Sequence, residues 1–309
     1  MREYWRGSAE AWECDEMGHM NVRFWVRHFM DGLSVLAQDI GCGDAFAQGA
    51  TATLIPTRQH IKFIREARAG APLFSRGGIV SISETEIIFY SEIVHAFSGE
   101  IGATSIATLS HIDAKTGKAF AFPARVAALG HIHLVEIPPH GQPRSLSLDS
   151  NIPIINSDDA ASQGYRFIGQ ASVRNDEVDL FDRLYPEGMI GRVSNAMPNF
   201  LSQWREDATA EMTEIDGVTR TAGAAVLEYR LDYLAWPRAG DLTCVYSGLT
   251  EVAGKTITLR HLVLDALTGA PYCVCEALAV TLDLNARKII ANPPRAKAAL
   301  EAMLVAPAR

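Results

Sequence analysis

The chain contains two copies of one unit. When residues 68–128 are shifted by 170 positions without a gap, 14 of the 61 positions are identical. A shift of 164 positions aligns the front parts and places Ser8, Glu13 and Asp15 on Ser172, Glu177 and Asp179. This self-similarity predicts a duplicated unit of roughly 135 residues. Chemistry that is kept in one copy and lost in the other can therefore be compared within a single sequence.

The duplication defines the expected domains. We predict an N-terminal domain over residues 1–135, a linker over 136–163 and a C-terminal domain over 164–309. The linker is rich in Pro, Ser, Asn and Asp, which is typical of a surface connection. Its segment Ile152–Ile155 is apolar enough to pack against the surface that it crosses.

Each copy shows the same order of elements. A short strand (near 3–12 and 167–176) precedes a polar turn and then one apolar helix, over Val22–Ile40 with Gly41 as C-cap, or over Met189–Arg205. Pro198 should kink or divide the second helix. Four strands in hairpin order follow, in the first copy near 51–66, 72–83, 86–97 and 101–113, and a proline-led helix ends each copy. One helix against a long antiparallel sheet predicts an α+β fold, with the helix buried on the concave face.

Composition excludes several classes of protein. With 48% hydrophobic residues and a net charge of −8, the 309-residue chain is typical of a soluble two-domain protein and carries no basic signature for nucleic acid. No apolar run is long enough for a membrane span, and the N-terminus does not resemble a signal peptide, so we expect a cytoplasmic protein. Five scattered cysteines predict no disulfide framework, and Cys273 and Cys275 are interpreted as core residues rather than a metal pair. We expect neither a metal nor a cofactor.

The turn before the first helix resembles a known signature. The segment Trp12–Trp25 contains Asp15, His19 and Asn21 in the Asp-x-x-x-His-x-Asn spacing of hotdog-fold thioesterases, a group that includes 4-hydroxybenzoyl-CoA thioesterases and plant acyl-ACP thioesterases. The strand that ends at Ile61–Gly70 is similar to the second strand of that family. The resemblance implies a double hotdog, in which each repeat wraps a long antiparallel sheet around one central helix. It also implies hydrolysis of acyl-CoA or acyl-ACP thioesters.

The resemblance places Asp15, His19 and Glu66 in three catalytic slots of the plant enzymes, while Met17 stands where those enzymes have an Asn. Thioester hydrolysis needs a carboxylate as nucleophile or general base and donors for the oxyanion. Asp15 would supply the first. The donors would be amides at a helix start, and two starts remain open: the substrate-binding positions Asn21, Val22, Arg23 and Phe24, or the region Met189–Arg192.

In the second copy Asp179 is kept, but Arg183 replaces His19. This difference favours a vestigial site there over a second active centre. Two other functions stay open: a hotdog hydratase or dehydratase, against which the four-residue step from Asp15 to His19 argues, and a non-catalytic acyl-binding protein. Because related single repeats assemble beyond dimers, we expect a homo-oligomer of this chain.

Overall fold

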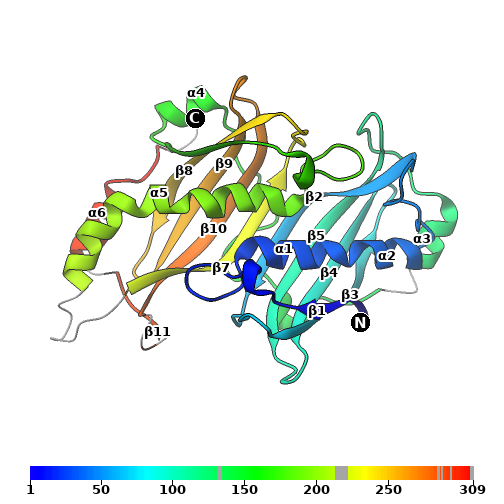
Figure 1. Cartoon of the computed structure of the whole chain (residues 1–309), viewed down its shortest axis with the longest axis horizontal. Coiled ribbons are helices and arrows are strands. Elements are labelled where there is room, and N and C mark those ends of the chain that lie inside the picture. Colours follow the sequence, from blue (N-terminus) through cyan, green and yellow to red (C-terminus); the bar gives the residue numbers. More distant parts are fainter. Residues whose placement is uncertain (131–133, 213–221, 284–285, 287, 293, 307–309) are drawn as a thin grey trace. The chain divides into compact units, whose positions relative to one another are not determined.

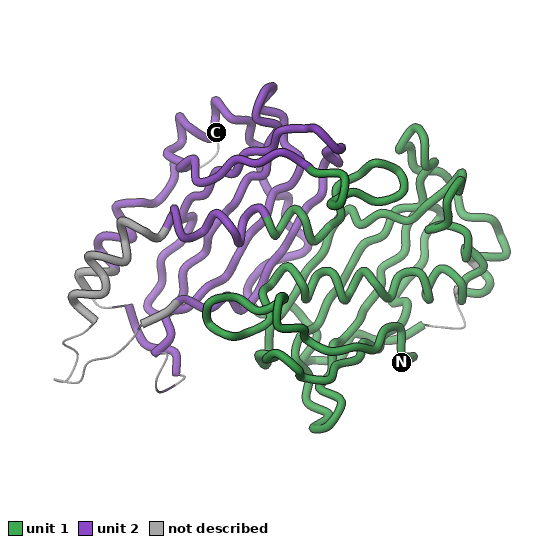
Figure 2. Tube along the Cα trace, viewed as in Figure 1, with its two compact units in different colours: residues 1–144, 174–191 green, residues 145–173, 192–309 purple. Residues whose placement is uncertain are grey.

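A computed structural model describes residues 1–130, 134–212, 222–283, 286, 288–292 and 294–306. The chain divides into two compact units, one formed by residues 1–144 and 174–191 and the other by residues 145–173 and 192–309 (Figure 2). Compactness thus groups the start of the second repeat, residues 174–191, with the first unit. The domain boundaries that the sequence repeats predict, 1–135, 136–163 and 164–309, stay a prediction.

The first unit contains five antiparallel strands in the order β1-β3-β4-β5-β2, with helices packed across them (Figure 1). The predicted strands are present with nearly the expected bounds: β1 Arg2–Ser8, β2 Ala52–Phe63, β3 Pro72–Ile82, β4 Glu86–His95 and β5 Ile101–Asp113. The helices are η1 Ala11–Glu13, α1 Val22–Asp31, α2 Leu33–Asp39, α3 Ala124–Gly130 and η3 Pro139–Gly141.

The second unit repeats this topology in the order β6-β8-β9-β10-β7. Its strands are β6 Arg166–Ser172, β7 Ala222–Tyr233, β8 Leu242–Val252, β9 Thr256–Asp265, β10 Pro271–Asp283 and the short β11 Lys288–Ile289. Its helices are α4 Ser157–Ser162 and α6 Pro294–Glu301, together with the greater part of α5 Pro186–Met212. The turn η4 Asn175–Glu177 belongs to the first unit.

Strand register confirms the duplication at the level of single residues. In β1, Arg6 pairs with Phe74 of β3, and the register shifts between Glu3 and Trp5. In β6, Gln170 pairs with Cys244 of β8, and the register shifts between Phe167 and Gly169. Each of these β6 and β8 positions equals the β1 or β3 position plus 164 or 170. The two-offset alignment of the sequence is therefore also the structural alignment.

The core of the first unit lies between the helix pair and the sheet. Leu36 and Ile40 of α2 and Ile79, Phe89 and Leu109 of the strands are almost fully buried in one cluster. Burial of such side chains stabilises a fold by roughly 1.5–3 kcal/mol each. Gly41 has φ +77°, a conformation that favours glycine, and it ends the helix as predicted.

The predicted single helix over Val22–Ile40 is wrong in one respect, because it is divided into α1 and α2 at Gly32. A Cβ atom at Gly32 would lie 2.9 Å from Cβ of Tyr4, so strand β1 comes too close for a larger residue. Glycine is also among the weakest helix formers. Close packing against the edge strand therefore explains both the residue and the break.

Of the two outcomes predicted for Pro198, a kink or a division of the second helix, the division is wrong. Helix α5 extends from Pro186 through Pro198 to Met212, a longer span than the expected Met189–Arg205. Proline removes one helical hydrogen bond but keeps a helical φ. Because Ala196 and Phe200 on either side are buried, tertiary packing holds the helix together across this position.

The linker is held by specific contacts in each unit. In the first unit, His140 Nε2 lies 2.5 Å from Oε1 of the buried Glu92, which also accepts hydrogen bonds from Arg76 and Tyr90. Burial alone would raise the pKa of Glu92, but these donors bring its pKa below the usual range. In the second unit, Ile152 and Ile155 are buried, which confirms that this apolar segment packs against the fold.

Cys273 and Cys275 of β10 are both fully buried and free, as expected for core residues. Burial raises the pKa of both thiols well above the ordinary value, so they are inert as nucleophiles. Within the described ranges, no helix is long and apolar enough to cross a membrane.

Candidate active site

The Asp15 turn is a closed loop stabilised by its own backbone. Cys14 and Met20 form an isolated antiparallel bridge, and the amide of Asp15 donates to the carbonyl of His19 at 2.9 Å. Gly18 takes φ +75°, the left-handed conformation that lets the loop reverse direction. This geometry fixes the Asp15 backbone immediately before helix α1.

The Asp15 carboxylate uses one oxygen to hold the turn and leaves the other available. Oδ1 accepts the amide of Met17 at 2.9 Å and the amide of His19 at 3.4 Å. For Oδ2, the part of the chain that the structure describes provides no hydrogen-bond partner. The side chain is half-buried, so it stays reachable from solvent. An oriented carboxylate oxygen of this kind can attack a carbonyl or accept a proton from water.

The structure brings together two other predicted site residues. His19 Nε2 lies 3.1 Å from Oε2 of Glu66, just beyond the end of β2, and the His19 side chain is only 13% exposed. A carboxylate on one ring nitrogen of a histidine fixes its orientation and tautomer. Asp15, His19 and Glu66 therefore form one connected group through the Asp15–His19 backbone and the His19–Glu66 pair.

The start of helix α1 is already capped within the chain. The Asn21 side chain accepts a hydrogen bond from the Arg23 amide at 3.0 Å, and the Asn21 amide donates to the backbone carbonyl of Glu13 at 2.8 Å. The amide of Phe24 donates to the carbonyl of Asn21 at 2.9 Å. Of the four predicted substrate-binding positions, only the Val22 amide is left to consider as an oxyanion donor.

The start of helix α5, which belongs to the first unit up to Gly191, is built differently. Tyr185 stands where the first copy has Asn21, and tyrosine does not cap a helix. Pro186 has no N–H, so Glu187 carries the first amide of this helix. Because α5 begins at Pro186, the predicted donors at Met189–Arg192 lie beyond its first turn, where amides bond back along the helix.

A buried carboxyl lies at this helix start. Glu187 is only 8% exposed. Burial raises its pKa, and a hydrogen bond from its own backbone amide together with the charges of Arg23 and Arg27 partly opposes that shift. Arg23 lies against the α5 backbone, since a Cβ atom at Gly191 would come within 2.9 Å of Arg23 Cδ. Sequence reasoning missed Glu187; the available signal was the opposite charge of Arg23 and Glu187 at equivalent positions of the two copies.

Asp179 occupies an almost identical turn, but its second carboxylate oxygen has a different environment. Its Oδ1 accepts the amides of Phe181 and Arg183 at 2.8 and 3.0 Å, as in the Asp15 turn. Its Oδ2 is engaged by Nε and Nη2 of Arg183 at 3.1 and 2.8 Å. Asp182, with φ +60°, takes the place of Gly18. Arg183 therefore occupies the oxygen that Asp15 leaves open.

The two repeats together define a double hotdog. Two solved structures have this fold: an acyl-ACP thioesterase from Bacteroides thetaiotaomicron (TM-score 0.63, 13% identity, covering 89% of this chain and 96% of that one) and a 12:0-ACP thioesterase from Umbellularia californica (TM-score 0.65, 10% identity, covering 89% and 92%). At these identities the likeness establishes the fold alone.

Sequence comparison finds similarity in the first repeat. Residues 9–129 match the profile of the thioesterase-like superfamily. A similar region, 33% identical over 118 residues, occurs in the L-carnitine dehydrogenase/betainyl-CoA thioesterase of Rhizobium meliloti. The match covers 38% of this chain and 23% of that protein, so this chain corresponds to less than a quarter of the relative's length.

Proposed function

We propose that this protein hydrolyses an acyl thioester to a free acid and a thiol, with Asp15 as the nucleophile or general base. One observation carries the proposal: Asp15 and Asp179 share the same turn, yet only Asp15 has an oxygen that is not engaged by a neighbouring side chain. The match of residues 9–129 to the thioesterase-like superfamily supports the reaction class.

Two routes fit a carboxylate at this position. As a general base, Asp15 takes a proton from water while the water oxygen attacks the thioester carbonyl. As a nucleophile, its Oδ2 forms an acyl anhydride that water then hydrolyses. In both routes the C–S bond breaks as the oxyanion collapses, and its electron pair leaves on the sulfur as a thiolate. In the first route the thiolate takes the proton that Asp15 removed from water, and in the second it takes a proton from solvent. His19, oriented by Glu66, is suited to position the attacking water.

The oxyanion requires donors that are not already used by the fold. At the start of α5, the Glu187 amide has no capping side chain from Tyr185, and its contact is with the Glu187 carboxyl group itself, which an oxyanion would have to displace. At the start of α1, Asn21 accepts the amides of both Arg23 and Phe24. The positive end of the α5 helix dipole favours an oxyanion at its start. We therefore propose that the α5 start, rather than the α1 start, polarises the thioester carbonyl.

The thiol carrier is proposed as coenzyme A, with an acyl carrier protein as the alternative partner. The relative from Rhizobium meliloti is named for a CoA thioester, whereas the structurally similar proteins are named for ACP thioesters. The proposed homo-oligomer is tested by light scattering, where a mass near the 33.6 kDa of one chain would contradict it.

The test is a hydrolysis screen over acyl-CoA esters, including betainyl-CoA and esters of short, long and aromatic acids, with release of free thiol as the readout. We expect turnover of at least one ester, lost in Asp15→Asn. Binding without thiol release across the panel, equal in wild type and Asp15→Asn, would instead identify an acyl-binding protein.

A further inference from the structure

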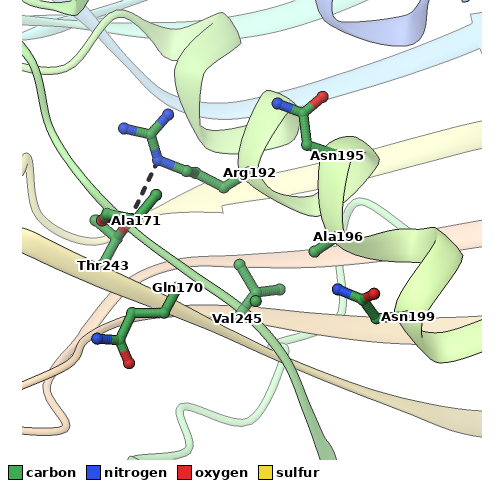
Figure 3. A pocket seen from close by; sticks show the side chains of 9 residues that line it. Gln170, Ala171, Arg192, Asn195, Ala196, Asn199, Thr243 and Val245 are labelled. Atoms are coloured by element: carbon green, nitrogen blue, oxygen red, sulfur yellow. Dashed lines mark hydrogen bonds between the residues drawn. The ribbon is translucent and has the colours of Figure 1, made fainter.

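A cavity of about 250 Å³ opens in the second unit between helix α5 and strands β6 and β8. It is smaller than the roughly 300–1,000 Å³ typical of pockets for drug-sized ligands, so its size suits one planar ring system, single or fused, rather than an acyl chain. Arg192 reaches from the helix toward the strands, with Asn195 and Asn199 along the same helix (Figure 3). Other lining residues are Gln170, Thr243 and Val245.

The first repeat shows what fills the equivalent space. Strand register makes Trp5, which pairs with Ser75, the counterpart of Gly169, which pairs with Val245. The indole ring of Trp5 stacks on the imidazole of His28, with ring centres 4.1 Å apart and planes inclined by 20°. In the second repeat, Gly169 removes the indole, and Arg192 stands in place of His28.

Helix α5 compensates for the missing indole ring with only one additional methyl group, that of Ala196. The counterpart of Ala196 is Gly32, so the pair Trp5 and Gly32 of the first repeat becomes Gly169 and Ala196 in the second. A Cβ atom at Gly169 would lie 2.7 Å from Cβ of Ala196, so these two residues are in close contact. A methyl group is far smaller than an indole, which explains why a ring-sized cavity remains.

The wall of the cavity is suited to a planar polar ring. Arg192 is 8% exposed, and its guanidinium is held in place by Thr243 Oγ1 at 3.3 Å and the Ser172 carbonyl at 3.2 Å. A guanidinium plane stacks on aromatic rings, as the imidazole of His28 does in the first repeat. The exposed amide side chains of Gln170 and Asn195 provide donors and acceptors for ring nitrogens, while Asn199 Nδ2 donates to the Ile168 carbonyl at 2.8 Å.

We propose that this cavity binds a planar nitrogen heterocycle of indole or purine size, stacked on Arg192 in the place that Trp5 occupies in the first repeat. The inference goes beyond the proposed hydrolysis, because none of its residues belongs to the Asp15 turn. The same chemistry is present in a free indole and in the adenine of a nucleotide.

Saturation-transfer NMR with adenosine and with indole, each titrated against the full chain, tests the proposal. We expect saturable transfer to the ring protons of at least one probe and none to free ribose. A preference for adenosine that weakens several-fold in Asn195→Ala identifies a purine site, whereas indole binding that is unchanged in Asn195→Ala identifies an apolar ring site. Failure of both rings to bind at millimolar concentration would overturn the proposal.

The matched variant is Gly169→Trp combined with Ala196→Gly, which rebuilds the pair found in the first repeat. We expect it to stay folded by thermal melting and to weaken ring binding at least tenfold. Equal binding in this variant and in wild type would show that the rings bind elsewhere. Asn195→Ala, at an exposed position, gives a second measurement if the double variant does not fold. Asp15→Asn should leave ring binding unchanged, which separates this site from the hydrolytic one.

Discussion

The Asp15 turn and the Asp179 turn differ mainly in one side-chain interaction. Both aspartates accept two backbone amides of their own loop, so both stabilise a turn before a helix. In the second copy, two nitrogens of the Arg183 guanidinium, Nε and Nη2, donate to the remaining oxygen, Oδ2 of Asp179. The comparison separates the structural role, which both residues have, from the availability of a carboxylate oxygen, which only Asp15 retains.

The helix starts that follow these turns differ in the complementary sense. Asn21 caps α1 with its side chain, whereas at α5 the residue in that place is Tyr185, and the Glu187 amide contacts its own carboxyl group instead. The first copy therefore combines an available carboxylate with a capped helix start, and the second combines an engaged carboxylate with a helix start that lacks an Asn cap. A fused double repeat permits such differences, because its two copies can change independently.

The largest effect is expected from removing the charge of Asp15. Asp15→Asn keeps the shape and the amide-accepting oxygen, so the fold should be retained while kcat falls about a hundredfold or more, equivalent to roughly 2.7 kcal/mol of transition-state stabilisation. Steady-state kinetics on the ester identified by the screen measures this. Asp179→Asn is the matched control and should change kcat far less. Equal losses in the two variants would reduce both residues to turn formers.

A second test adds to α5 the cap that it lacks. Tyr185→Asn provides a side-chain acceptor for the Glu187 amide, as Asn21 does for Arg23, and so competes with an oxyanion there. We expect kcat to fall about tenfold or more with the fold intact. Tyr185→Phe serves as the control because it changes no capping. Should Tyr185→Asn keep full activity while Asn21→Ala alters kcat, the α1 start would be the oxyanion site.

A smaller effect is expected from the His19–Glu66 pair. His19→Ala should lower kcat by an amount between the Asp15→Asn and Asp179→Asn effects, because the ring positions water without being the base. Glu66→Gln should lower kcat by about tenfold at most, since Gln can still accept a hydrogen bond from His19. A double-mutant cycle between the two positions measures their coupling. Fully additive losses would mean that the pair does not act as a unit.

The smallest effect concerns the pH dependence of stability at the α5 start. Burial raises the folded-state pKa of Glu187 above its ordinary value of 4.5, so the folded protein binds this proton more tightly than the unfolded chain. The free energy of unfolding therefore falls as pH rises from 4.5 through the folded pKa, and the loss persists above it. Glu187→Gln should raise Tm by about 1–2 °C near pH 8 and leave it unchanged near pH 4.

Thermal melting across pH provides that measurement. Glu16→Gln, at an exposed carboxylate, is the control and should leave the pH profile of Tm as in wild type. A lower Tm for Glu187→Gln at pH 8 would mean that attraction to Arg23 and Arg27 outweighs the cost of burying the charge.

The sequence by itself determined the duplication, the order of elements and the strand bounds to within about three residues at most ends. Alternating apolar residues and turn residues specify strands and turns through their local conformation, and the same pattern occurs in both copies. Asp15 and His19 were found through their resemblance to the signature of hotdog thioesterases, which could be recognised because both residues lie in one short segment.

Only the tertiary structure decided the features that depend on contacts between distant segments. The break at Gly32 follows from the close approach of Tyr4, and α5 continues through Pro198 because the residues around it are buried. The His19–Glu66 pair, the buried Glu187 beside Arg23 and the cavity left by Gly169 all join segments far apart in the chain. Sequence patterns report which residues favour burial, but which side chains meet there is fixed only when helices and sheets pack against each other.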